Sequence, residues 1–365
     1  MTNTKTISYR QLAVLLVLSR LFSDGADLRA AQTGYSMQRF TVIVVSSLII
    51  FLLYLPLIIF ASKHPSESVI SVIAGKSRVL GWGCGLFVTL ALLLNAVSAV
   101  CSTELYSSST VFAKAPMILL VLLPLAVCGI GAWKGIQGTA RSGVLFGAVF
   151  LVFLVFIVIS VWERFEWEWL YPAFLEEPEL FAGQVVRQLG RNTELLAFGV
   201  LMEYADKKAA YTVFWYIPSI MLLQILKLLL QVIVLGPFLN STSFPFFTIS
   251  ALSDIVLFQR LDGINVGVWL LLCIVKVTIA LLCTRAVFTR LVGEKTGKWS
   301  VWVGTVAVAL AALLLGGGSG SALSLDSISA SWIILLAGGV LIPVIALIAA
   351  KTGKKREETA HEKNG

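Results

Sequence analysis

A single lysine stands in the middle of a long apolar run. Lys276 lies inside "LLLCIVKVTIALL", residues 270–282. At the centre of a membrane helix a lysine costs roughly 2.5–3.5 kcal/mol on insertion scales, so its ammonium group should face the protein interior and meet a carboxylate or backbone carbonyls. We expect Glu194 as its partner, with Glu104 as the second choice. Such a pair could take part in ligand binding or only lock two helices together, and the sequence leaves both roles open.

Two other groups of polar residues interrupt apolar segments. One follows "LAVLLVLSRLF" and the other precedes "LLAFGVLM". A helix that breaks inside the membrane frees backbone N–H and C=O groups, which can hold the ammonium and carboxylate of a small zwitterion. The alternative is that each group is an ordinary loop beside a short helix. The predicted ligand site consists of Ser23, Asp24, Gly25, Ser98, Gly190, Asn192, Thr193, Glu194, Phe198 and Lys276.

The composition shows which elements must position these residues. Of the 365 residues, 58% are hydrophobic and 13% charged, with a mean hydropathy of +0.91, which excludes a soluble globular domain. Runs of about 20 apolar residues cross the hydrocarbon core as helices. We therefore expect an all-α integral membrane protein, a single polytopic domain over residues 1–365. Its ten predicted segments are approximately 8–26, 41–61, 80–105, 115–133, 142–162, 184–203, 211–236, 262–287, 299–316 and 330–350.

The two interrupted segments occupy matching places among the ten. They are the first and the sixth, so each opens a half of five helices, about 8–162 and about 184–350. Interrupted segments at corresponding positions of two halves are typical of transporters built from inverted repeats, with the ligand at the breaks. The sequence therefore predicts a 5+5 inverted-repeat fold of the amino acid transporter type. Helices one, three, six and eight should surround the site.

The charge distribution predicts the orientation in the membrane. Most of the 28 lysines and arginines fall in segments on the same side as the N-terminus, which places both termini in the cytoplasm. The net charge of +8 is then an orientation signal and a contact with anionic lipid, and no nucleic-acid binding is expected. Residues 351–365 should form a short disordered cytoplasmic tail.

The seventh segment carries a polar stripe. Gln224, Lys227 and Gln231 are spaced three and four residues apart, which places them on one helix face. The stripe could line a cavity or contact a partner helix, and the sequence does not decide between them.

Catalytic and metal-binding motifs are missing from the sequence. We find no Walker loop, no G-x-S-x-G and no H-E-x-x-H, and the five cysteines and two histidines lack metal-ligand spacing. We therefore expect no enzymatic activity, no metal and no cofactor.

Several stretches resemble the spore permease-type B subunits of endospore germinant receptors, a family of the amino acid/polyamine/organocation transporter superfamily. They are "ISYRQLAVLLVLSRLF", "TELLAFGVLMEYADKK" and the region from "LGPFLNSTSF" to "LLLCIVK". The family pattern of an arginine, an acid, a tryptophan and a lysine around the eighth helix falls on Arg260, Asp262, Trp269 and Lys276. The acid of the sixth helix falls on Glu194. The chain departs from the family at both breaks, where it has "SDGADLRAAQTGYSMQRF" and Arg191–Asn192, so the ligand identity does not carry over.

The resemblance implies a membrane subunit that binds a small nutrient, such as an amino acid, in the spore inner membrane. It implies partnership with an A subunit and a lipoprotein C subunit, and a signal for germination. A secondary transporter of amino acids or cations is the alternative, because a transporter fold does not fix the function. A structural membrane scaffold is a third possibility.

Overall fold

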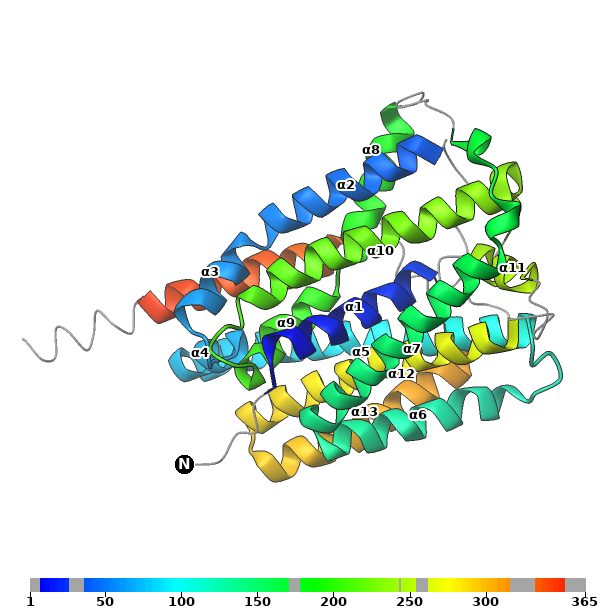
Figure 1. The fold of residues 1–365 in the computed structure, drawn as a ribbon. Coiled ribbons are helices and arrows are strands. Elements are labelled where there is room, and N and C mark those ends of the chain that lie inside the picture. The colour runs from blue at the N-terminus through cyan, green and yellow to red at the C-terminus, as the bar shows by residue number, and fades with distance from the viewer. Residues whose placement is uncertain are drawn as a thin grey trace, which may run out of the picture.

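The structure, a computed structural model, is a helical bundle. It describes residues 7–25, 36–170, 178–242, 244–253, 262–315 and 332–351. Within these residues the β-type pairing is limited to one isolated bridge between Ile7 and Ala205. The long helices run roughly side by side along one axis, with α1 near the middle (Figure 1). The α-helices are α1 (Tyr9–Gly25), α2 (Ser36–Leu53), α3 (Leu55–Lys63), α4 (Val69–Lys76), α5 (Arg78–Ser109), α6 (Met117–Lys134), α7 (Ile136–Ser160), α8 (Pro178–Gly190), α9 (Glu194–Leu201), α10 (Tyr211–Leu235), α11 (Pro245–Ala251), α12 (Asp262–Leu291) and α13 (Glu294–Leu315).

Short helical turns complete the described chain. They are η2 (Trp162–Arg164), η3 (Trp167–Trp169), η4 (Met202–Tyr204), η5 (Gly236–Asn240) and the π-helical η6 (Leu335–Leu341). The last turn lies within an apolar helix, Trp332–Lys351.

The described helices account for the ten predicted segments. Seven are long and apolar enough to cross a membrane, and the bent pair α2–α3 gives an eighth candidate. This pair bends by 47° where Pro56 enters the first turn of α3, because proline lacks the N–H that would continue the helix. Helix α1 and the pair α8–α9 make up the remaining two. All-helical architecture and membrane-spanning character are thus confirmed.

The predicted first break at Ser23, Asp24 and Gly25 is wrong, because α1 is continuous through these three residues, and residues 26–35 lie outside the described part of the chain. The second break is present, between Gly190 at the end of α8 and Glu194 at the start of α9.

Helix α12 forms the centre of the bundle. Of the membrane-length helices described, it is the most enclosed, with 78% of its most apolar window buried. It packs against α5, α13, α6, α1 and α7, while α1 also packs against α10. Lys276, halfway along α12, therefore faces other helices, as the cost of a charge in lipid requires.

Local hydrogen bonds mark where α1 begins and where α8 ends. At the start of α1, the backbone N–H of Ser8 donates to the Gln11 side chain at 3.0 Å, a capping-box contact. At the end of α8, Asn192 Nδ2 donates to the carbonyl of Gln188 at 3.0 Å and its backbone N–H donates to the carbonyl of Leu189 at 3.1 Å. These bonds satisfy carbonyls that a helix end would otherwise leave unpaired.

One end of the bundle is closed by backbone and side-chain contacts. This terminal end is where α1 begins and the last helix finishes (Figure 1). The Ile7 N–H donates to the Tyr204 carbonyl at 2.8 Å, and the Asp206 N–H donates to the Ile7 carbonyl at 3.0 Å. Arg290, near the end of α12, pairs with the buried Glu203 carboxylate at 3.1 Å. Segments before α1, after α9 and at the end of α12 are thereby joined.

Gly339 in η6 marks a close approach of the last helix to the core. A Cβ atom at this position would lie 2.7–2.9 Å from the ring of Tyr54, which is fully buried between α2 and α3. We predict that Gly339→Ala lowers the free energy of unfolding by about 1–3 kcal/mol through overpacking against this rigid ring. Gly267→Ala is the matched control, because nothing lies within 4 Å of its Cβ position. Thermal unfolding of the purified protein measures both, and equal melting temperatures would contradict the packing.

Candidate functional site

The centre of the site is a buried ion pair between Lys276 and Glu194. Lys276 Nζ lies 2.7 Å from Glu194 Oε1 and also donates a hydrogen bond to Ser23 Oγ at 2.7 Å. Both charged residues are almost fully enclosed, with 6% and 3% of their surface exposed. The predicted partner is confirmed, and the second choice, Glu104, is not the partner. The cluster joins α12, α9 and α1.

Two serines of α1 complete the contacts of the Glu194 carboxylate. Ser19 and Ser23 each donate a hydrogen bond to Oε1 at 3.3 Å. Glu194 is the first residue of α9, where the helix dipole favours negative charge. The other carboxylate oxygen, Oε2, is buried and has no hydrogen-bond partner among the described residues. This oxygen is therefore available to a donor from a ligand.

The break between α8 and α9 is braced from three sides. The hydroxyl of Tyr54 donates to the Asn192 carbonyl at 3.1 Å, and that of Tyr216 donates to Asn192 Oδ1 at 3.4 Å. From α5, Asn95 Nδ2 donates to the Thr193 hydroxyl. The polar groups freed at this break are thus held by neighbouring helices, as irregular backbone inside a bundle requires.

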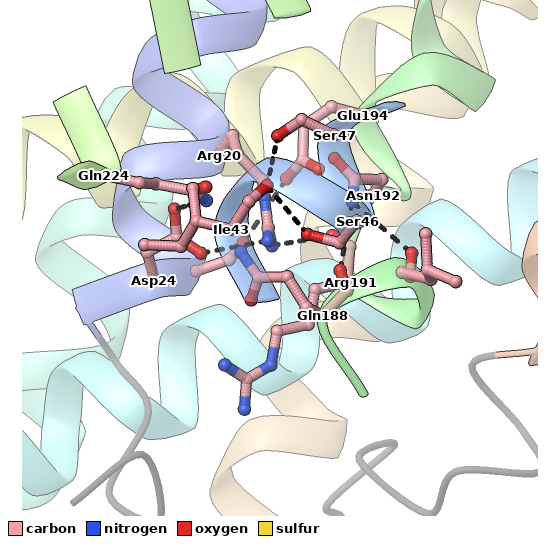
Figure 2. A network of polar contacts seen from close by, with 12 residues as sticks. Arg20, Asp24, Ile43, Ser46, Ser47, Gln188, Arg191, Asn192, Glu194 and Gln224 are labelled. Atoms are coloured by element: carbon pink, nitrogen blue, oxygen red, sulfur yellow. Dashed lines mark hydrogen bonds and ion pairs between the residues drawn. The ribbon is translucent and has the colours of Figure 1, made fainter. Parts of the chain in front are cut away.

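A second ion pair lies one turn away on α1. Arg20, fully buried, pairs through Nη2 with Asp24 at 3.0 Å and donates through Nη1 to the Arg191 carbonyl at 3.0 Å (Figure 2). Gln224 Nε2 donates to Asp24 Oδ2, and Lys227 Nζ donates to the Asp24 carbonyl at 2.8 Å. The end of α1 is therefore tied to both α8 and α10.

The cavities around these residues differ greatly in size. A cavity of about 10 Å³ is lined by Ser19, Asn95, Glu194 and Lys276, among others, and holds about one water molecule. A cavity of about 180 Å³, which we call the large cavity, lies beside Asp24. Gln224, Lys227 and Gln231 line it, so the polar stripe faces a cavity.

The predicted site residues fall into three groups. Ser23, Thr193, Glu194 and Lys276 meet at the buried cluster or line its small cavity, and Asn192 and Asp24 take part in the neighbouring network. Gly25 and Gly190 are the last residues of α1 and α8. The other two stay predictions: Ser98 lines none of these cavities, and Phe198 is fully buried in the hydrophobic core.

Three residues of the site are missing from the prediction. Ser19, Arg20 and Asn95 contact residues of the break between α8 and α9 directly. Arg20 and Asp24 are four residues apart in α1, and an i,i+4 pair of opposite charges was the signal that could have identified this contact. Arg260 of the family pattern lies outside the described residues, whereas Trp269 packs on Phe22 of α1 with ring centroids 4.9 Å apart.

The fold and the site define a multi-pass membrane protein with a transporter-type fold. Solved structures with the same fold include a substrate-bound, outward-open Na⁺-coupled sialic acid symporter, with a TM-score of 0.68 and 12% identity over 94% of this chain and 79% of that one. Another is Mhp1, a nucleobase-cation-symport-1 family transporter in a closed conformation with bromovinylhydantoin bound, with a TM-score of 0.66 and 13% identity over 94% and 80%. The predicted inverted-repeat fold is thereby confirmed, while the repeat boundaries stay a prediction.

The family follows from the sequence. The model of the spore germination protein family, the spore permeases, matches residues 6–316, so the chain belongs to that family. The resemblance of its motifs to spore permeases is thus confirmed. A search of curated protein sequences finds no match.

The buried pair of Lys276 and Glu194 should affect the stability of the protein. Lys276→Met leaves the Glu194 carboxylate buried without its cation, so we expect the free energy of unfolding to fall by about 3–5 kcal/mol. Adding Glu194→Gln should recover a large part of this loss, because the uncompensated charge is removed as well. Thermal unfolding of the purified single and double variants measures both effects.

The control is Lys295→Met, at an exposed position near the start of α13. It should leave the melting temperature nearly unchanged. A double variant no more stable than Lys276→Met alone would show that the two charges do not compensate each other.

Proposed function

We propose that this protein is a ligand-sensing subunit of a spore germinant receptor that binds a small nutrient, probed here as an amino acid, without catalysing a reaction. One observation carries the proposal: Glu194, Lys276 and Ser23 link α9 and α1 to α12, and Glu194 retains a buried oxygen without a partner in the described chain. Family membership supports the link to germination. The membrane would be the spore inner membrane, with both termini in the cytoplasm.

The proposed mechanism is competition for the Glu194 carboxylate. The ammonium group of an amino acid would bind Oε2 and weaken the contact with Lys276, which lies 2.7 Å from Oε1. Since the cavity there holds about one water molecule, the ligand must also separate α1 from α9. Such a ligand shifts the population between two bundle conformations, because it binds only the opened one. Partner A and C subunits would respond to the movement.

Germination of spores tests this site. Glu194→Ala should reduce the germination response to amino acids by at least about tenfold, since it removes the carboxylate that would bind the ligand's ammonium group. Lys276→Ala removes the contact that the ligand must weaken, so it should make germination at least about tenfold less dependent on added amino acid. Lys295→Ala serves as the control, and protein levels in the spore membrane are compared by immunoblotting. Wild-type responses in both site variants would remove the proposed site.

Secondary transport is the second candidate function. The fold likeness to a Na⁺-coupled sialic acid symporter and to Mhp1 favours it, as do the buried charges beside the break between α8 and α9. Liposomes containing this chain alone distinguish the two candidates. Sustained uptake driven by an ion gradient would favour transport, whereas the sensing role predicts binding without flux and dependence on partner subunits.

A further inference from the structure

The large cavity is separate from the buried Lys276–Glu194 cluster. Asp24, near the end of α1, lines it, and the other lining residues come mainly from α2, α5, α8, α10, α11 and α12. Asp24 is the one predicted ligand-binding residue in its lining. A volume of about 180 Å³ corresponds to on the order of ten water positions, which is enough for a small organic molecule.

The charged side chains around the large cavity are mostly positive. Arg39, Arg187, Arg191 and Lys227 line it, and Asp24 is the only acidic residue among its described lining residues. Asp24 is also compensated already, because Arg20, which does not line the cavity, pairs with it at 3.0 Å. Cations that converge on a partly enclosed space raise the local concentration of anions.

The geometry of these cations suits an acidic ligand. They come from α2, α8 and α10, so they approach the cavity from different directions. The guanidinium group of Arg191 points away from Arg20, to which only the Arg191 backbone carbonyl is bonded (Figure 2). Guanidinium groups present planar pairs of donors that match a carboxylate. Several such groups favour a ligand with two acidic groups over one with a single negative charge.

Part of the wall of the large cavity is aromatic. Tyr106 packs against Phe244 and Trp269, with ring centroids 4.9 and 5.3 Å apart. Trp269 Nε1 is buried and has no hydrogen-bond partner among the described residues. The wall therefore offers apolar surface and an N–H donor, which suits an organic anion with a carbon skeleton better than an inorganic ion.

We propose that the large cavity binds a small organic anion with two acidic groups, such as a dicarboxylate or an acidic amino acid. The cations hold the acidic groups and the aromatic wall covers the carbon skeleton. This ligand class goes beyond the proposed function, and it is tested by binding alone, so it stands or fails independently of germination.

Binding to the full-length protein in phosphatidylcholine nanodiscs tests the proposal. Isothermal titration calorimetry compares succinate and L-glutamate with L-alanine and inorganic phosphate. We expect saturable binding of succinate and L-glutamate, at least about tenfold weaker binding of alanine and phosphate, and loss of affinity as salt screens the charges. Absent binding of both diacids, or equal binding of phosphate, would overturn the proposal.

Variants of Arg187 identify the site of binding. Arg187→Gln should weaken succinate binding by at least about tenfold, and Arg187→Lys should weaken it less, because the positive charge remains. Arg164→Gln is the matched control: this exposed arginine follows α7 near the end of α10 and does not line the cavity. Equal affinities of Arg187→Gln and Arg164→Gln, with unchanged melting temperatures, would place the anion elsewhere and overturn the assignment.

Discussion

The structure depends on the requirement that a charge inside an apolar bundle must have a partner. Lys276 and Glu194 meet this requirement only if the centre of α12 and the start of α9 lie close enough for Lys276 Nζ to reach Glu194 Oε1, at 2.7 Å. Ser23 accepts a bond from the same ammonium group, which fixes α1 against both. The positions of α1 and α9 relative to the central helix α12 therefore follow from one electrostatic constraint, the pairing of Lys276 with Glu194. Apolar side chains pack around this pair.

Helix α1 takes part in two polar networks, because its last turns carry a pair of serines and a pair of oppositely charged residues. Ser19 and Ser23, four residues apart, face Glu194, while Arg20 and Asp24, also four apart, face α8 and α10. This spacing places each pair on its own side of the helix. A shift of α1 that changed one network would therefore change the other, so the buried cluster and the large cavity are mechanically linked.

Much of this arrangement was predictable from sequence, because a charged group inside a membrane bundle must either have a partner of opposite charge or contact other polar groups. The break between α8 and α9 and the pairing of Lys276 with Glu194 follow from that restriction, whereas the break predicted at Ser23–Gly25 does not occur, since these residues continue α1. Ser98 and Phe198 stay predictions as site residues. Their helices were assigned correctly, but the rotation of each helix depends on tertiary packing, which leaves Ser98 outside the cavities described above and Phe198 in the hydrophobic core. The large cavity was beyond prediction for the same reason: its lining residues come mainly from seven helices, α1, α2, α5, α8, α10, α11 and α12, and no local sequence pattern determines how these helices are placed relative to one another.

The joint between Ile7 and the segment after α9 is made of peptide groups. Side chains at these positions can change during evolution without removing it, since each residue other than proline keeps its N–H and every residue keeps its carbonyl. The connection between the two halves at the terminal end is therefore robust to sequence drift. Alanine scanning, which removes side chains, would leave this joint intact and so would not reveal that it couples the first helix to the sixth.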